Sequence, residues 1–529
     1  ACPWVSTWWL SPIILMTRDD TKHGKRYLLE NLFVFLGIFF FLALSHRAAL
    51  LGYYVLHDDL FFWEKPPHSF AQHPLHDISA AMGRAGGAYI LTLAGWMVNV
   101  VSDLNLLRVF SLAQLSASAL LCFICLKKQF SYKFVALLIS AVIFTLPPFQ
   151  VMIFWTGACF HSTAVLLASL AGFLICRLPL NRPVKRNFTA KYFILAAVLL
   201  FCAISTYASA ATFYWALCAL VIYSLRKEGY VFLKRTAFHF FAAGAIAHIA
   251  YAILLQIMKQ GSIALVRGMH NPYRVNTDYF AKLEWFFSEP LVNTLNFWNI
   301  FPSKIIAFAV LLFMAVPIIF VIGDGEKKFQ RSSPKRNTVR RELFTVFVFI
   351  ALVPLSYLPN LVSVGESPYY RCLAGLMPVF LVMFLWALTI YFEMLPEKVF
   401  KRSLTAILVI SCLYASYQAN ATVYIHRVAP SQRELTFLIK RLRQTDIERI
   451  EEIAVIPRKD QSQKIRYDEY GVLTHPISRC IRLMVKCALR EIGKEDALTG
   501  KTVRIVDTDA IKEARESSKI FLIDFNEKW

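Results

Sequence analysis

The chain has 529 residues, of which 57% are hydrophobic, and its mean hydropathy is +0.49. Soluble domains are about 45–50% apolar, so this composition excludes an ordinary soluble protein and predicts a membrane protein. The net charge is +22, but the Lys and Arg residues gather in short loops between apolar segments. That distribution is typical of membrane topology rather than of nucleic-acid binding, and we expect no nucleic acid among the partners.

Residues 1–30 are predicted to form a cytoplasmic amino-terminal segment. Met16 begins a hydrophilic stretch typical of a natural start, and residues 1–15 lack the basic flank and cleavage site of a signal peptide. Residues 1–15 are therefore left out of the fold prediction, as possible non-native sequence upstream of that start.

Residues 31–420 are predicted to form an all-α polytopic membrane region. A spanning helix needs about 20 apolar residues, and this criterion gives about eleven transmembrane helices, near residues 31–48, 105–126, 133–149, 160–177, 191–206, 209–225, 236–257, 304–323, 342–358, 371–392 and 402–420. Basic residues precede the first helix and recur in every second loop, which predicts a cytoplasmic amino-terminus. The loops 49–104, 150–159, 258–303 and 359–370 then face outward, as does the carboxy-terminus.

Part of the first outward loop has a helical pattern of its own. Residues 77–101 are largely apolar but include Arg84, Gly86 and Gly87. We expect this stretch to lie at the outer membrane interface rather than to cross the bilayer.

Residues 421–529 are predicted to form a small periplasmic α/β domain. Three apolar runs, 453–456, 503–506 and 520–523, have the composition of strands. Helical patterns cover about 431–450 and 477–492, and alternating helices and strands fit a small layered domain.

An acidic pair follows the first predicted span, in the sequence His57-Asp58-Asp59. Ionisable residues at membrane depth are energetically costly and tend to mark substrate or ion paths. A carboxylate here can act as a general base on a hydroxyl group, with His57 as a possible assistant. The alternative is that the aspartates cap a short following helix.

The same loop is rich in histidine. His73, His76 and Asp77 have a spacing that can place metal ligands on one helix face, and His68 lies nearby. A divalent cation is therefore left open as a cofactor, and no other cofactor is predicted. The alternative is a polar loop whose histidines cap a helix or contact substrate.

Four outward arginines are candidates for binding a lipid phosphate, because a guanidinium group pairs bidentately with phosphate oxygens. They are Arg84, Arg267, Arg274 and Arg371. The alternative for each is an interfacial side chain that extends toward lipid headgroups.

Aromatic side chains near the predicted outer helix ends are candidates for contact with a sugar or an acceptor. They are Trp155, His161, Tyr207 and Tyr370. The simpler interpretation is the aromatic belt that membrane proteins carry at the interface.

Two further short motifs accompany the acidic pair, Gly83-Arg84 and Tyr369-Tyr370-Arg371. With these motifs and the predicted topology of residues 31–420, the chain resembles the GT-C membrane glycosyltransferases. Within that superfamily it looks most like the bacterial Gtr-type glucosyltransferases, which modify O-antigen in serotype conversion.

The resemblance implies an inverting glycosyltransferase. An acceptor hydroxyl attacks the anomeric carbon of a sugar, glucose in the enzymes it resembles, that is carried on polyprenyl phosphate. Asp58 or Asp59 takes the proton, an arginine stabilises the leaving phosphate, and the transition state is oxocarbenium-like. The implied partners are this donor, a polysaccharide or lipid-linked oligosaccharide acceptor, membrane lipids, and a separate donor synthase and flippase. The implied location is the bacterial inner membrane, with the site facing the periplasm.

Other functions remain as alternatives. A flippase or transporter of lipid-linked saccharide is expected to have charged or broken helices at the bilayer midplane. The predicted spans are instead almost free of ionisable residues, with Arg108 and His248 as the exceptions. An acyltransferase needs a catalytic histidine, for which His57 and His161 are candidates. A polysaccharide polymerase would depend more on the outward arginines than on the acidic pair.

Overall fold

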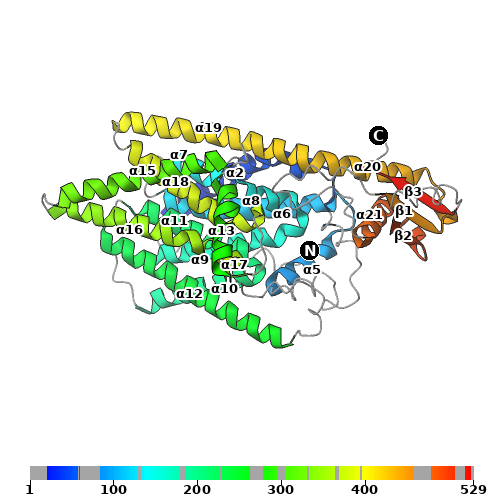
Figure 1. Cartoon of the computed structure of the whole chain (residues 1–529), viewed down its shortest axis with the longest axis horizontal. Coiled ribbons are helices and arrows are strands. Elements are labelled where there is room, and N and C mark those ends of the chain that lie inside the picture. Colours follow the sequence, from blue (N-terminus) through cyan, green and yellow to red (C-terminus); the bar gives the residue numbers. More distant parts are fainter. Residues whose placement is uncertain are drawn as a thin grey trace.

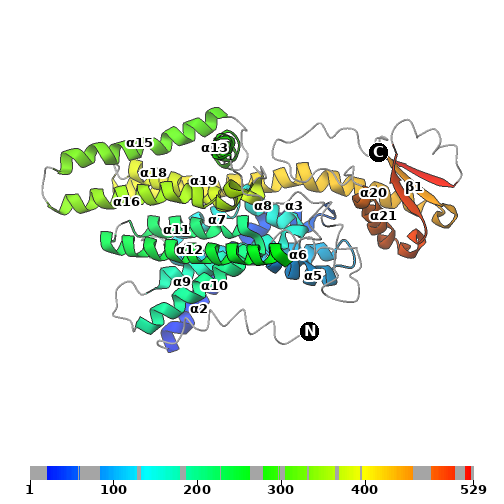
Figure 2. The ribbon, with the colours of Figure 1, turned by 60° about the horizontal axis from the view of Figure 1, so that its bottom comes forward.

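The structure is a computed structural model that describes residues 21–56, 59, 84–127, 133–178, 186–226, 228–261, 278–295, 297, 304–329, 333–363, 369–392, 396–456, 478–506 and 519–525. The described residues are mostly helical and include one small sheet. Long helices run side by side along the long axis of the molecule, and the sheet lies at one end of that axis (Figures 1 and 2).

Six helical segments among the described residues are long and apolar enough to cross a membrane. They are Arg26–Ser45 in α2 (Thr21–Ser45), Asp103–Leu126 (α6), Thr156–Arg177 (η4, Thr156–Ala158, and α9, Cys159–Arg177), Ala190–Ala211 in α10 (Arg186–Ala211), Tyr230–Ile257 in α12 (Tyr230–Gly261), and Arg402–Arg443. The chain is therefore a mostly α-helical membrane protein, as its composition predicts. The sequence prediction of about eleven spans exceeds this number.

The other predicted spans coincide with bent or shorter helices. The predicted span 133–149 consists of α7 (Lys133–Ile143) and α8 (Pro147–Phe154), which meet at a bend of 63°. Pro147 and Pro148 explain the bend, since proline fits the first turn of a helix but cannot continue a preceding one. The shorter apolar helices among the described residues are α11 (Phe213–Ser224), Lys304–Ile319 within α15 (Lys304–Phe329), and α18 (Leu376–Phe392). The predicted span 342–358 falls largely on α16 (Ser333–Leu355), whose first half is rich in charge.

Short helices lie in the loops that were predicted to face outward or at the edges of those loops. They are α3 (Arg47–Leu51), α5 (Ala85–Met97), α13 (Tyr279–Ser288), α14 (Pro290–Leu295), α17 (Leu358–Val362) and η6 (Tyr370–Leu373). With 13 residues, α5 is about 20 Å long at 1.5 Å per residue, too short to cross a hydrocarbon core of about 30 Å. In Figure 1, α13 runs across the long helices rather than along them.

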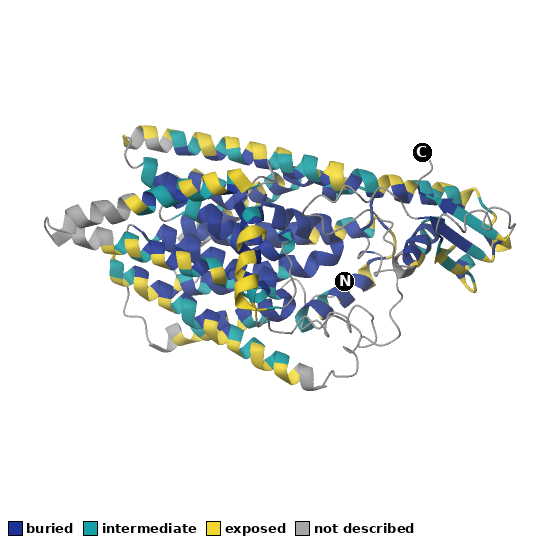
Figure 3. Ribbon diagram, viewed as in Figure 1, coloured by how far each residue is buried: buried dark blue, intermediate teal, exposed yellow. Residues whose placement is uncertain are grey.

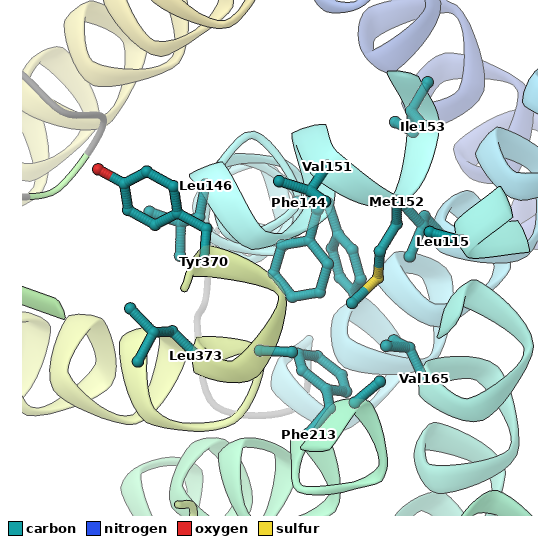
Figure 4. Close-up of a cluster of buried hydrophobic side chains, with 14 of the residues drawn as sticks. Leu115, Phe144, Leu146, Val151, Met152, Ile153, Val165, Phe213, Tyr370 and Leu373 are labelled. Carbon is teal, nitrogen blue, oxygen red and sulfur yellow. The ribbon is translucent and has the colours of Figure 1, made fainter. Parts of the chain in front are cut away.

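The centre of the helical region is closely packed. Every residue of α11 is buried, whereas α12 and α19 expose one side (Figure 3). Figure 4 shows part of the core around Phe144 and Phe213. The rings of Phe144, Phe149 and Phe213 meet there with centroids 4.7–5.6 Å apart. Burial of such large rings stabilises the junction of α7, α8 and α11.

The two ends of the helical region differ in chemistry. At one end, Lys127 donates to Asn31, Lys133 forms an ion pair with Glu30, and Arg177 donates to Tyr27. These cations come from loops that were predicted to be cytoplasmic. The candidate site residues that the structure describes lie near the opposite ends of α6 and α9.

The carboxy-terminal part follows the membrane region without a break in helical structure. α19 (Glu397–Val423), a π-helical turn η7 (Tyr424–Val428) and α20 (Ala429–Arg443) form one continuous run, so the domain boundary predicted at residue 421 falls within a helix. The short helix η8 (Ile447–Arg449) then leads into the sheet.

The sheet has three parallel strands in the order β2-β1-β3, where β1 is Glu452–Ile456, β2 is Thr502–Ile505 and β3 is Ile520–Asp524. Ile453 of β1 lies opposite Val503 of β2 and Phe521 of β3. α21 (Ser478–Glu491) and η9 (Glu495–Leu498) lie between β1 and β2 in the sequence. All three strands fall on the apolar runs that the sequence predicts.

Candidate functional site

Seven of the predicted site residues are described by the structure: Asp59, Arg84, Trp155, His161, Tyr207, Tyr370 and Arg371. The other eight lie outside the described residues: His57, Asp58, His68, His73, His76, Asp77, Arg267 and Arg274. Ring and cation–π contacts join five of the seven described residues, and Asp59 reaches this group through the amide of Gly157, two residues after Trp155. We call Asp59, Arg84, Trp155, His161, Tyr207 and Arg371 the Asp59 cluster.

The Asp59 carboxylate is fully buried and accepts two backbone hydrogen bonds. Its Oδ2 accepts from the Leu56 amide at 3.1 Å, and its Oδ1 accepts from the Gly157 amide at 2.7 Å. Gly157 belongs to η4, the short turn that joins α8 to α9. Hydrogen bonds to an ionised acceptor are among the stronger ones in proteins, so Asp59 ties its own loop to the start of α9.

Arg108 holds the chain that leads to Asp59. It lies on α6, is fully buried, and donates to the carbonyl oxygens of Gly52 and Tyr54 at 3.2 and 2.9 Å. Its guanidinium group also lies over the Tyr54 ring, 3.8 Å from the centroid. The Tyr54 hydroxyl in turn donates to the Phe154 carbonyl at 2.8 Å. Residues 52–54 are therefore fixed against both α6 and α8.

Three aromatic rings and two guanidinium groups form a row beside η4. The rings of His161 and Tyr207 are stacked with centroids 3.7 Å apart, and Trp155 meets His161 edge to face at 5.7 Å. Arg84 lies over Tyr207 at 4.7 Å and Arg371 over Trp155 at 5.3 Å. Both guanidinium groups act electrostatically on the His161 ring between them, so the row offers two cations in an aromatic setting.

His161 is the least satisfied polar group of the row. Its side chain is 1% exposed, and within the part of the chain that the structure describes neither ring nitrogen has a hydrogen-bond partner. Buried polar groups are nearly always hydrogen-bonded, because an unmade bond there is energetically costly. The two nitrogens of a neutral imidazole can donate one bond and accept another, which suits contact with a polar ligand.

Close backbone packing brings Arg84 to Tyr207. α10 departs from helical geometry at Tyr207, where φ is −159° and ψ is 104°. The start of α5 packs against this kink without side chains between: a Cβ at Gly87 would lie 2.7 Å from the Thr206 carbonyl oxygen. Arg84 is the residue directly before α5, so the two glycines of Gly86-Gly87 set its position against the Tyr207 ring.

Tyr370 lies at the edge of the cluster. Figure 4 shows its ring beside Leu146 in the hydrophobic core, with the hydroxyl directed away from the other labelled side chains. Two residues on, the Cys372 sulfur lies 4.0 Å from the Tyr207 hydroxyl. η6 therefore carries both Arg371 and a contact to the kink of α10.

Two residues that shape the site were not predicted in that role. Gly157 supplies a backbone amide, which leaves no sequence signal beyond a glycine between two apolar segments. Arg108 did leave a signal, since a charged residue within a predicted span needs a structural or functional reason. Its contacts now supply a structural one.

The metal prediction falls on residues that the structure does not describe. Within the described ranges, no group of three or more His, Cys, Asp or Glu side chains is placed to hold a metal ion. The chemistry that the cluster offers is therefore one buried carboxylate, one histidine and two guanidinium groups.

Comparison of the chain with known protein-family models finds no match, and comparison with curated proteins likewise finds none. The function is therefore inferred from the geometry of the Asp59 cluster and from the sequence motifs.

Proposed function

We propose that the protein is a GT-C type membrane glycosyltransferase that moves a sugar from a polyprenyl-phosphate donor to an acceptor hydroxyl with inversion. The observation that carries the proposal is the Asp59 cluster itself. In this cluster an acidic residue, two arginines and three aromatic rings from five separate parts of the chain lie together at one end of the helical region. These are the groups that such a reaction needs.

The two guanidinium groups are assigned to the leaving group. When the bond between the anomeric carbon and the phosphate oxygen breaks, the lipid phosphate gains negative charge. Arg84 and Arg371 present planar, permanently charged donors that suit phosphate oxygens. Trp155 and Tyr207 lie between these two guanidinium groups, and we assign them to the sugar because aromatic side chains are the residue type that stacks on sugar rings.

The acidic segment is assigned to the acceptor. In our proposal the acceptor oxygen attacks the anomeric carbon while a carboxylate takes its proton, which is general base catalysis. Asp59 already accepts two backbone hydrogen bonds that hold its loop. We therefore assign the proton to Asp58, its neighbour in the sequence, and a positioning role to Asp59.

The same proposal includes glucose as the sugar and a polysaccharide or lipid-linked oligosaccharide as the acceptor. It also includes about eleven membrane spans. A bacterial inner-membrane location, a periplasmic site, and a donor made and flipped by other proteins belong to it as well. The opposed placement of the basic loops and the Asp59 cluster supports this orientation, because basic loops favour the cytoplasmic side.

The experiment that tests the proposal is sugar transfer by the purified protein in lipid nanodiscs. The donor is polyprenyl-phosphate glucose, and the acceptor is a lipid-linked oligosaccharide. We expect transfer with inversion in the wild type and its loss in Asp58→Asn. Release of free sugar or movement of the donor between leaflets, without transfer, would contradict it.

One observation favours a second function, acyl transfer. His161 is buried with no hydrogen-bond partner among the described residues, and an acyltransferase needs a histidine to activate a hydroxyl. His161→Gln distinguishes the two functions. Glycosyl transfer tolerates a neutral side chain that still donates and accepts, whereas acyl transfer loses its base.

A further inference from the structure

Among the described residues, the Glu491 carboxylate links the carboxy-terminal domain by a hydrogen bond to the segment that leads to Asp59. Glu491 is the last residue of α21. Its Oε2 accepts from the Tyr53 hydroxyl, and its Oε1 accepts from the Val101 amide at 2.7 Å. One side chain therefore joins the carboxy-terminal domain to two separate outward segments of the membrane region.

Both partners of Glu491 lead toward the Asp59 cluster. Tyr53 lies between Gly52 and Tyr54, whose carbonyl oxygens Arg108 holds. Val101 lies in the turn between α5 and α6, and the same turn is closed by Asp103, which accepts from the Val100 amide at 3.0 Å. Arg84 stands at the other end of α5. Glu491 thus contacts two segments: the one that leads to Asp59, through Tyr53, and the one that follows α5 and its preceding Arg84, through Val101.

The surroundings of Glu491 favour a fixed contact rather than a loose surface one. Val101 is 1% exposed, and Cys487, one turn earlier on α21, is fully buried and within electrostatic range of Asp59. Burial and the bond to Glu491 raise the pKa of the Tyr53 hydroxyl. The phenol therefore keeps its proton and remains a donor.

We propose that Glu491 is a positioning residue through which the carboxy-terminal domain holds the Asp59 segment in its place. The domain is then a working part of the candidate site and not an appended module. An effect of Glu491 on catalysis rests on the proposed function, whereas its role in holding the Asp59 segment does not.

The test uses hydrogen–deuterium exchange on the full-length protein in nanodiscs. Glu491→Ala removes both bonds, Glu491→Gln keeps the shape without the charge, and Tyr53→Phe removes one hydroxyl. The matched control is Glu451→Ala, which removes a carboxylate of the same domain whose partner is the exposed Lys519. We expect exchange to rise about tenfold in the amides of residues 52–56 and 98–103 in Glu491→Ala, and to stay at wild-type rates in the control.

Four further outcomes are decisive. A rise in exchange of the same amides in Tyr53→Phe that is smaller than in Glu491→Ala supports the inference. So does a double variant, Tyr53→Phe with Glu491→Gln, whose exchange is no faster than that of Glu491→Gln alone, because both residues then act through one shared contact. Unchanged exchange at residues 52–56 in every Glu491 variant overturns the inference. Exchange that rises throughout the membrane helices also overturns it, since Glu491 would then stabilise the whole fold rather than position one segment.

The sugar-transfer assay separates this inference from the proposed function. If the wild type transfers sugar, Glu491→Gln should lower kcat about tenfold, because the acidic segment that Glu491 holds is the one assigned to the acceptor. If the wild type transfers nothing, the proposed function fails, and exchange alone still decides whether Glu491 positions the segment.

Discussion

The Asp59 carboxylate accepts a hydrogen bond of 2.7 Å from the Gly157 amide, although 98 residues separate the two in the sequence. This bond joins the loop after α3 to the turn that begins α9. It places the acidic segment beside the row of His161 and Tyr207. The geometry of the candidate site depends on it.

Asp59→Asn is expected to destabilise the protein, because an amide side chain has only one acceptor oxygen for the two backbone donors of Leu56 and Gly157. The loss should be about 1–3 kcal/mol and should appear as a lower unfolding temperature in detergent. Asp58→Asn is the matched control and should unfold at the wild-type temperature. Equal unfolding temperatures for the wild type and Asp59→Asn would contradict the positioning role of Asp59.

Gly87→Ala is expected to separate α5 from α10. The new Cβ would lie 2.7 Å from the Thr206 carbonyl oxygen and 2.9 Å from the Phe160 ring, so the backbone must shift. We expect a loss of about 1–3 kcal/mol, measured by thermal unfolding. Gly37→Ala on α2 is the control, since nothing lies within 4 Å of its Cβ. If Gly87→Ala is as stable as Gly37→Ala, the close approach of Arg84 to Tyr207 is not enforced by this packing.

Arg84→Lys and Arg371→Lys should each weaken donor use, because lysine cannot pair bidentately with phosphate. Loss of one charge-assisted hydrogen bond corresponds to about a 10- to 100-fold rise in the KM for the polyprenyl-phosphate sugar. Arg177→Lys, at the far end of α9, should leave this KM unchanged. A donor KM that is equal in all three variants would show that neither Arg84 nor Arg371 contacts the phosphate.

The contact between Tyr53 and Glu491 has a defined pH dependence. Burial and Glu491 raise the pKa of the Tyr53 hydroxyl above the ordinary tyrosine value of about 10. The protonated form is the one stabilised in the folded protein. The contribution of the bond is therefore complete below about pH 10 and is lost as the pH rises through the folded-state pKa.

The difference between the alkaline absorbance titrations of the wild type and Tyr53→Phe isolates this one phenol. It should titrate above the ordinary range, and Glu491→Gln should lower its midpoint. A midpoint near pH 10 in the wild type would mean that the contact with Glu491 does not form in solution.

Much of the membrane architecture follows from local sequence. Apolar length locates helices such as α6 and α9, because a bilayer demands long runs without charge. The strand composition of residues 453–456, 503–506 and 520–523 likewise predicts β1, β2 and β3. The bend between α7 and α8 was missed, although Pro147 and Pro148 are visible in the sequence, because hydropathy does not register geometry.

The site was predictable as a set of residue types but not as an arrangement. Asp59, Arg84 and Arg371 stood out because charges at helix ends in a membrane protein are costly and few. The stacking of His161 on Tyr207 depends on the kink in α10, and no local pattern specifies which helix ends meet. Glu491 gave no signal at all, since an acidic residue at the end of a helix in the carboxy-terminal domain is common and its partners lie 390 or more residues away in the sequence.

The most direct test is sugar transfer from polyprenyl-phosphate glucose by Asp58→Asn, with the folded state checked by its unfolding temperature. We expect a stable protein whose transfer rate is at least about 100-fold below that of the wild type, because general base catalysis contributes about 10²–10⁴-fold. Wild-type transfer by a folded Asp58→Asn protein would contradict the assignment of the proton to the acidic segment.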